Sequence, residues 1–175
     1  MRTFAIVLFI LSIFIAYSAP IFYEAYVEHT VLKASRHIAS DLIWARRLSI
    51  RTGKNYGVKF IKGENPGYFI FFENPSKVIK SVRLKDINSH VKFYNAFDDK
   101  GVALVDNTFT FIGQGRSEQQ TVPGQDSIFL INDSDESRGL TDRVVRVYID
   151  RDNNNIKLLR VTEKTDAGDY IFSAI

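Results

Sequence analysis

The feature that most constrains this chain is a stretch of twenty consecutive residues without a charged side chain. It extends from Thr3 to Phe22 and reads TFAIVLFILSIFIAYSAPIF. A helix of this length spans about 30 Å, the thickness of the hydrocarbon core of a bilayer. The sequence therefore predicts a membrane-spanning helix within residues 1–26. Its large apolar side chains include Phe4, Ile6, Leu8, Ile10, Leu11 and Ile13.

The charges that flank this run predict its orientation. Arg2 precedes the run, whereas Glu24 and Glu28 follow it. Because basic residues favour the cytoplasmic side, we expect a single-pass protein of the inner membrane with a cytoplasmic N-terminus. The remaining residues, 27–175, then form a domain in the periplasm or outside the cell.

The same segment also fits a secretory signal peptide. The small residues Ala16, Ser18 and Ala19 would allow cleavage near Ser18. An apolar run of this length is long for a signal peptide, and the residues after it continue a helical pattern. We therefore favour a retained anchor, and an exported soluble binding domain is the alternative.

The helical pattern extends well beyond the apolar run. Gly53 is suited to the left-handed residue after a helix, so the helix is expected to end near Thr52. Pro20 lacks an N–H group and should kink the helix. The result is one bent helix of about fifty residues, or about 75 Å. On a wheel of 100° per residue, its core-facing arc contains Val27, Val31, Ala34, Ile38, Leu42, Ala45 and Ser49.

A second apolar strip lies beside the core-facing arc. One interpretation is that the domain buries a wide face of the helix and leaves Trp44 partly exposed. The other is that the strip contacts neighbouring subunits, because exposed apolar patches commonly mark interfaces. The residues of this candidate interface are Leu32, Ala39, Ile43, Trp44 and Ile50.

A stripe of basic residues lies almost opposite the core-facing arc. Such a stripe can contact phosphates of nucleic acid or of lipid headgroups, although it is more often the solvated face of a helix. A net charge of only +3 argues against strong non-specific binding of nucleic acid by the whole chain. The residues of this stripe are Lys33, Arg36, Arg47, Arg51 and Lys54.

After Tyr56 the pattern changes to short alternating runs separated by turn residues, which indicates strands. One long helix followed only by strands predicts an α+β fold, in which an antiparallel β-sheet head packs on the second half of the helix. The candidate strands are Tyr56–Ile61, Tyr68–Glu73, Val78–Leu84, Val91–Tyr94, Thr108–Ile112, Ser127–Ile131, Arg143–Ile149 and Ile156–Val161.

The residues needed for common catalytic sites are missing from the sequence. Cysteine is absent, and no zinc-protease, serine-hydrolase or phosphate-loop motif is present. The three histidines, His29, His37 and His90, lack metal-pair spacing. Gly113-Gln114-Gly115 has the glycine spacing of a phosphate loop but not the rest of that motif, so we interpret it as a turn. We expect neither an enzyme nor a cofactor site.

Two acidic segments contain oxygen atoms that can bind calcium. In the first, Asp150, Asp152 and Asn154 alternate. Asn155 and Val161 stand where a calcium loop needs a glycine and a glutamate. The second runs over residues 132–136, with Asp142 nearby. We interpret both as solvated turns, with calcium as the alternative.

One set of positions lies in the second half of the helix and in the first strand: Asp41-Leu42, Ala45-Arg46, Ser49 and Val58-Lys59-Phe60. This set resembles the GspH/FimT family of minor pseudopilins and pilins. Thr108-Phe109-Thr110-Phe111, followed by Gly113 and Gly115, is similar to that family's strand leading into a glycine turn. Pro20 is similar to the proline that pilins carry near the membrane exit. The most specific positions are those of the first set.

The resemblance implies a structural subunit of a type II secretion pseudopilus or a type IV pilus. Its apolar N-terminal helix, including Pro20, would assemble with the helices of other pilin-like subunits, and a DNA-binding minor pilin is a variant of this reading. The start of the chain departs from the family. No glycine precedes Gly53, no acidic residue precedes Glu24, and Thr3 falls at the family's glutamate position. Either the start codon is assigned too late, or this is a divergent subunit such as one at a filament tip.

Overall fold

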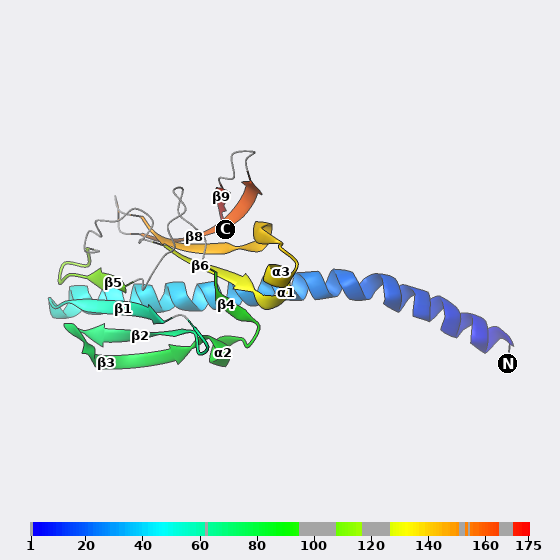
Figure 1. The fold of residues 1–175 in the computed structure, drawn as a ribbon, viewed down its shortest axis with the longest axis horizontal. Coiled ribbons are helices and arrows are strands. Elements are labelled where there is room, and N and C mark those ends of the chain that lie inside the picture. Colours follow the sequence, from blue (N-terminus) through cyan, green and yellow to red (C-terminus); the bar gives the residue numbers. More distant parts are fainter. Residues whose placement is uncertain are drawn as a thin grey trace.

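The structure is a computed structural model of the chain. It describes residues 2–61, 63–94, 108–116, 127–150, 153, 155–164 and 170–175, and for residues 2–5, 142, 162–164, 170 and 172 it describes the backbone alone. Figure 1 shows a long helix that projects from a head rich in strands. The N-terminus lies at the far end of the projecting half.

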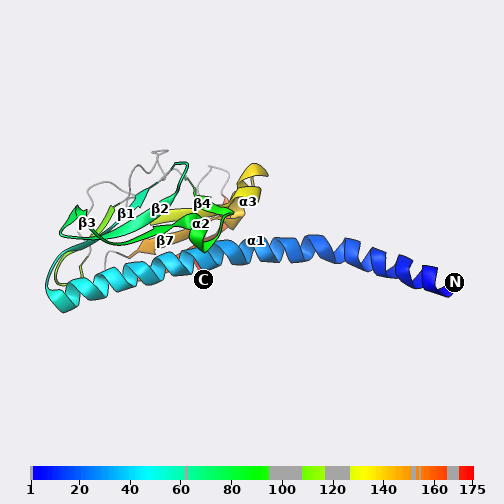
Figure 2. The ribbon, with the colours of Figure 1, turned by 90° about the horizontal axis from the view of Figure 1, so that it is seen from below.

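The long helix α1 runs from Arg2 to Thr52. It ends as expected, because Gly53 adopts a φ of +68° and its N–H donates to the Ser49 carbonyl at 2.9 Å. The helix continues through Pro20 without interruption, and its projecting half curves in both views (Figures 1 and 2). The prediction of one continuous helix of about fifty residues is therefore confirmed. Its projecting half is curved, and a kink at Pro20 itself stays a prediction.

The described strands form two antiparallel sheets. The first has the order β3-β2-β1-β5 and the second the order β4-β6-β7-β8-β9. The first sheet contains β1 (Tyr56–Ile61), β2 (Gly67–Phe72), β3 (Asn74–Arg83) and β5 (Thr108–Phe111). The second contains β4 (Val91–Phe93), β6 (Ser127–Asn132), β7 (Val145–Ile149), β8 (Ile156–Lys164) and β9 (Tyr170–Ala174).

Each of the candidate strands is present, with bounds shifted by a few residues, and the α+β layout is confirmed. Three short elements escaped the sequence pattern: the helices α2 (Leu84–Ile87) and α3 (Asp133–Ser137), and β9. Arg143 was wrongly assigned to a strand. It ends the 3-10 turn η1 (Thr141–Arg143), in which the Val144 N–H donates to the Thr141 carbonyl.

The second half of α1 packs against both sheets. It contacts β1 of the first sheet and β6, β7 and β8 of the second, and Figure 2 shows it lying along one side of the head. Burial along this half follows the predicted wheel. The fully or almost fully buried residues include Val27, Val31, Ala34, Ile38, Leu42, Ala45 and Ser49.

The turn after β5 fastens the far end of α1 to the first sheet. The Ser49 hydroxyl donates to the Ile112 carbonyl at 3.1 Å, and Arg46 Nε donates to the Gly115 carbonyl at 3.1 Å. The Gly113 backbone lies so near the helix end that a Cβ there would fall 2.2 Å from the Gly53 carbonyl oxygen. The predicted turn is thus confirmed, and Gly113 is required by close backbone packing.

We predict that Gly113→Ala destabilises the head by about 2–3 kcal/mol, because its methyl group would overlap a backbone atom that cannot rotate away. The control is Gly139→Ala, at a φ of +70° with no neighbouring atom within 4 Å of the added Cβ. That change carries only the cost of a left-handed backbone, about 1 kcal/mol. Urea unfolding followed by circular dichroism measures both, and an equal or smaller loss for Gly113→Ala would contradict the packing argument.

Candidate assembly surface on the long helix

The projecting half of α1 exposes a continuous apolar surface. An 18-residue window of this helix has a mean hydropathy of 2.2, and none of it is buried inside the protein. By length and composition, α1 is able to cross a membrane. Among the predicted contact residues, Ile6, Leu8, Ile10, Leu11 and Ile13 are all exposed, and the Phe4 side chain lies outside the described residues.

The apolar surface continues up to the start of the head. Tyr17, Tyr23 and Tyr26 are exposed near this junction, and Val27 is the first buried residue of α1 among those whose side chains are described. Tyrosine is enriched where a membrane helix meets the water interface, because its ring is apolar and its hydroxyl is polar. The change from an exposed to a covered helix thus coincides with an aromatic segment.

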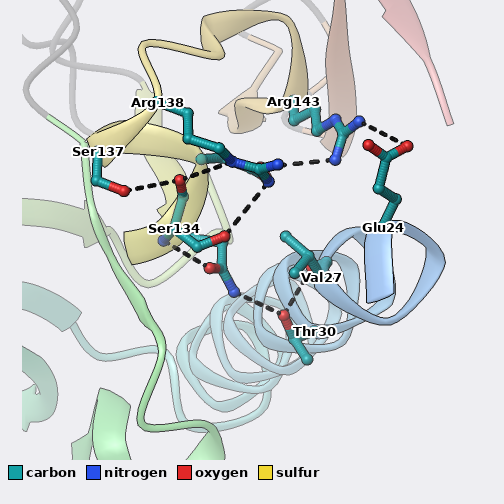
Figure 3. Close-up of polar contacts among 9 residues, drawn as sticks. Glu24, Val27, Thr30, Ser134, Ser137, Arg138 and Arg143 are labelled. Carbon is teal, nitrogen blue, oxygen red and sulfur yellow. Dashed lines mark hydrogen bonds and ion pairs between the residues drawn. The ribbon is translucent and has the colours of Figure 1, made fainter. Parts of the chain in front are cut away.

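Ion pairs attach the beginning of the covered half to the second sheet. An Arg143 guanidinium nitrogen lies 3.4 Å from a Glu24 carboxylate oxygen (Figure 3). A guanidinium nitrogen of Arg160 lies 2.6 Å from a Glu28 carboxylate oxygen. Arg143 also faces the Asp135 carboxylate at 3.5 Å. One arginine therefore bridges α3 and α1, next to the junction with the apolar half.

The helix α3 is held against α1 by its own polar contacts. The Asn132 side chain accepts a hydrogen bond from the Ser134 N–H and donates one to the Thr30 hydroxyl. Asp135 is fully buried and pairs with Arg138 at 2.8 Å. Figure 3 shows Ser134 and Arg138 above the helix turn that carries Thr30. The sequence pattern missed the attachment of α3 to α1 because Asn132 and Thr30 are distant in the chain.

The acidic residues of this segment are occupied by basic side chains. Lys92 pairs with both Asp133 and Glu136, and the hydrogen bond to Glu136 raises the pKa of the Lys92 ammonium. Among the described residues, no group of three acidic or histidine side chains is arranged to hold a metal ion. Asp152, Asn154 and the Asp142 side chain fall outside those residues.

A second polar cluster joins the middle of α1 to the first sheet. Asp41 is almost completely buried and accepts a hydrogen bond from the Tyr68 hydroxyl at 2.7 Å. Lys80 Nζ lies 2.7 Å from both Asp41 oxygens. The Tyr68 hydroxyl gives its one proton to Asp41, so its oxygen accepts from His37 Nδ1 at 3.0 Å. Burial, with the Asp41 hydrogen bond, raises the pKa of Tyr68.

These contacts give a physical role to the helix positions that carry the family resemblance. Asp41 binds β2 and β3 through its carboxylate, Arg46 and Ser49 bind the turn after β5, and Leu42 and Ala45 are fully buried in the core. Every one of these side chains therefore joins α1 to the head. Side chains of this type, at this spacing, are what a helix needs to serve as the spine of such a head.

The outer face of α1 within the head is only partly covered. Ala39 is 8% exposed and belongs to the core, and Leu32 is half-buried. Ile43, Trp44 and Ile50 remain exposed, at 37%, 39% and 54%. The candidate interface thus divides into a covered and an open part. All of the predicted basic stripe is exposed: Lys33, Arg36, Arg47, Arg51 and Lys54.

A shallow groove of about 380 Å³ opens on this outer face. Its floor is largely apolar and its two ends are cationic, which suits a ligand with apolar and anionic groups. The residues that line it are Arg36, Ala39, Ser40, Ile43, Trp44, Arg47 and Leu158.

Comparison with protein-family models, curated proteins and solved structures found no match to this chain.

We predict that Asp135→Asn destabilises the head by about 3 kcal/mol, because removing the buried carboxylate leaves the buried Arg143 Nη1 uncompensated. The matched control is Glu136→Gln, the next residue in the same helix. Its pair with Lys92 is exposed, so the loss there is below about 1 kcal/mol. Thermal unfolding of the full-length protein in detergent measures the stability of both variants. Equal losses of stability would show that the Asp135 ion pairs stabilise the head no more than an exposed ion pair does.

We predict that Tyr68→Phe destabilises the protein at neutral pH by about 1–3 kcal/mol, because Asp41 and His37 lose a buried partner. The same change flattens the alkaline limb of the stability curve. Because folding raises the Tyr68 pKa, its contribution is complete below pH 10, the ordinary tyrosine value, and is lost above it by up to about 1.4 kcal/mol per pH unit. Urea unfolding from pH 8 to 11 measures both effects. If the stability of the variant and of the unchanged protein fell in parallel with pH, the raised pKa of Tyr68 would be contradicted.

Proposed function

We propose that this chain is a structural subunit of a pilin-like filament, a minor pseudopilin of a type II secretion system or a minor pilin. The observation that carries the proposal is the division of one continuous helix into an exposed apolar half and a half that is the spine of a strand-rich head. In this assembly, the apolar half lies in the inner membrane before incorporation and packs among other N-terminal helices afterwards.

The extent of the exposed surface supports this use. Burial of one large aliphatic or aromatic side chain gains about 1.5–3 kcal/mol, and α1 exposes such residues at most positions from Ile6 to Phe22. Monomeric soluble proteins rarely expose apolar patches of more than a few hundred Å². Lipid or neighbouring helices would both cover this surface without any change in the head.

The attachment of the two halves also supports a mechanical role. Glu24 and Glu28 bind the head immediately after the apolar half, and Ser49 binds it at the far end. The head is therefore fixed to the helix along its length. A displacement of the helix in an assembly would carry the head with it, and this is what a filament subunit requires.

The proposed orientation places the N-terminus in the cytoplasm and the head in the periplasm or outside the cell. Arg2 before the apolar run and the acidic residues after it support this direction. The exported-domain alternative differs from the proposal only in the fate of residues 1–18. N-terminal sequencing of the mature protein separates them: a sequence that begins before Ser18 supports the anchor, and one that begins at Ala19 overturns it.

We predict that Ile10→Lys removes most of the protein from the membrane assembly. A lysine near the middle of a membrane helix costs about 2.5–3.5 kcal/mol, which corresponds to a loss of roughly 100-fold in the insertion equilibrium. The control is Ile79→Lys on β3, because Ile79 and Ile10 are similarly exposed, at 47% and 50%. Fractionation of cells into carbonate-washed membranes and soluble protein measures the change.

Disulfide crosslinking is a second measurement, and it is specific because the sequence has no cysteine of its own. A single Leu11→Cys substitution should form disulfide crosslinks to a cysteine placed in the helix of a co-expressed pilin-like subunit. An Ile79→Cys variant should not form them. Unchanged membrane retention of Ile10→Lys together with absent Leu11→Cys crosslinks would overturn the proposed function.

A further inference from the structure

The five cations of the basic stripe (Lys33, Arg36, Arg47, Arg51 and Lys54) have no carboxylate partner among the described residues. Most other cations of the head do have one. For example, Lys80 pairs with Asp41, Arg143 with Asp135 and Glu24, and Arg160 with Glu28. Lys54 follows the end of α1 and lies over the Phe72 ring. The other four cations leave positive charge without a carboxylate partner on one face of α1.

The stripe is long and contains an apolar groove. Its part on α1, from Lys33 to Arg51, spans about 27 Å along the helix axis. Arg36 and Arg47 are the first and last residues of α1 that line the groove, and they lie three helical turns or about 16 Å apart along the helix axis. Between them, Ile43 and Trp44 of α1 and Leu158 of β8 provide apolar contacts. The surface therefore offers apolar area between two positive ends.

We infer that this groove is the docking site for an acidic amphipathic helix of a different pilin-like subunit. The occupant places apolar side chains on Ile43 and Trp44, and carboxylates about three turns apart opposite Arg36 and Arg47. Recognition of an amphipathic helix by an apolar groove is a common mode of peptide binding. The inference rests on the proposed function, because it names the partner that continues the contact beyond the membrane segment.

Continuity with the apolar half of α1 favours a helix as the occupant. A neighbouring helix packed beside residues 6–22 and running along the same axis would meet the outer face of α1 within the head. Nucleic acid fits less well, because phosphates would use the cations and leave the exposed side chains of Ile43 and Ile50 without apolar contacts.

A second copy of this chain is also less suitable than a different subunit. The acidic residues of α1 are Glu24, Glu28 and Asp41. Glu24 and Glu28 are paired with Arg143 and Arg160, and Asp41 is almost completely buried and bound to Lys80. Helix α1 of a second copy therefore offers no unpaired carboxylate to Arg36 and Arg47, and a helix of another sequence suits them better.

The chain offers a direct reporter of this site, because Trp44 is its single tryptophan. Full-length protein in neutral detergent micelles is titrated with a synthetic amphipathic helical peptide of about 22 residues. This peptide has two glutamates eleven positions apart beside an apolar face. The comparison probes are the same peptide with glutamine at both positions and a 20-nucleotide single-stranded DNA. Emission of Trp44 is recorded at low and high salt.

The expected result is a saturable change of Trp44 emission with the acidic peptide that weakens with salt. The glutamine peptide should bind about tenfold more weakly, because two partly desolvated ion pairs are lost. The double variant Arg36→Gln/Arg47→Gln should show the same loss. The matched control Lys77→Gln/Arg83→Gln removes two exposed cations from β3 and should change binding by less than about twofold.

Equal binding of both peptides, or no loss in Arg36→Gln/Arg47→Gln, would overturn the inference. So would stronger, competing binding of the DNA, which would assign the stripe to nucleic acid. The Ile10→Lys variant should bind the acidic peptide normally in micelles, because the groove lies outside the membrane segment. Failure of the membrane assembly and failure of the groove are therefore distinguished by separate measurements.

Discussion

The structure depends on the packing of one helix face against two sheets that are not paired with each other. Ile38 and Leu42 of α1 are completely buried, and the same helix contacts β1 of one sheet and β6 to β8 of the other. Beside the helix, the Phe60 ring packs edge-on against the Phe93 and Phe109 rings, with ring centroids 5.6 Å apart in each pair. Because the described strands of the two sheets share no pairing, side-chain packing holds their relative position. That packing runs through the buried face of α1 and through the direct contact of Phe60 with Phe93, within one core cluster.

Polar contacts complement this packing at three levels along α1. Glu24 binds Arg143 where the head begins, Asp41 binds Tyr68 and Lys80 in the middle, and Ser49 binds the turn after β5 at the end. Buried polar groups are costly unless they are paired, so these contacts fix the register and rotation of the helix more than they add stability. The rotation matters, because it determines which stripe of the helix remains open to other molecules.

The open surfaces of the protein follow from this fixed rotation. The projecting half of α1 is apolar on all sides, whereas the outer face within the head combines Ile43 and Trp44 with unpaired cations. In the proposed filament, the first surface gives general affinity for lipid and for other apolar helices. The second provides charge, which contributes more to the selection of a partner than to affinity. A subunit that occupies one position in an assembly needs both properties.

Local signals in the amino-acid sequence were enough to predict the long helix, its end and its buried face, because a period of 3.6 residues and a glycine after the last turn do not depend on distant contacts. Alternating residues also predicted most strands. The meeting of Glu24 with Arg143 and Asp135 depends on the tertiary fold, since Glu24 lies more than a hundred residues before the other two. The same holds for the division of the second apolar strip, in which Ala39 is covered and Ile43 is open. A helical wheel gives direction around an axis, but the extent of cover is set by the neighbouring strands, whose positions no local pattern specifies.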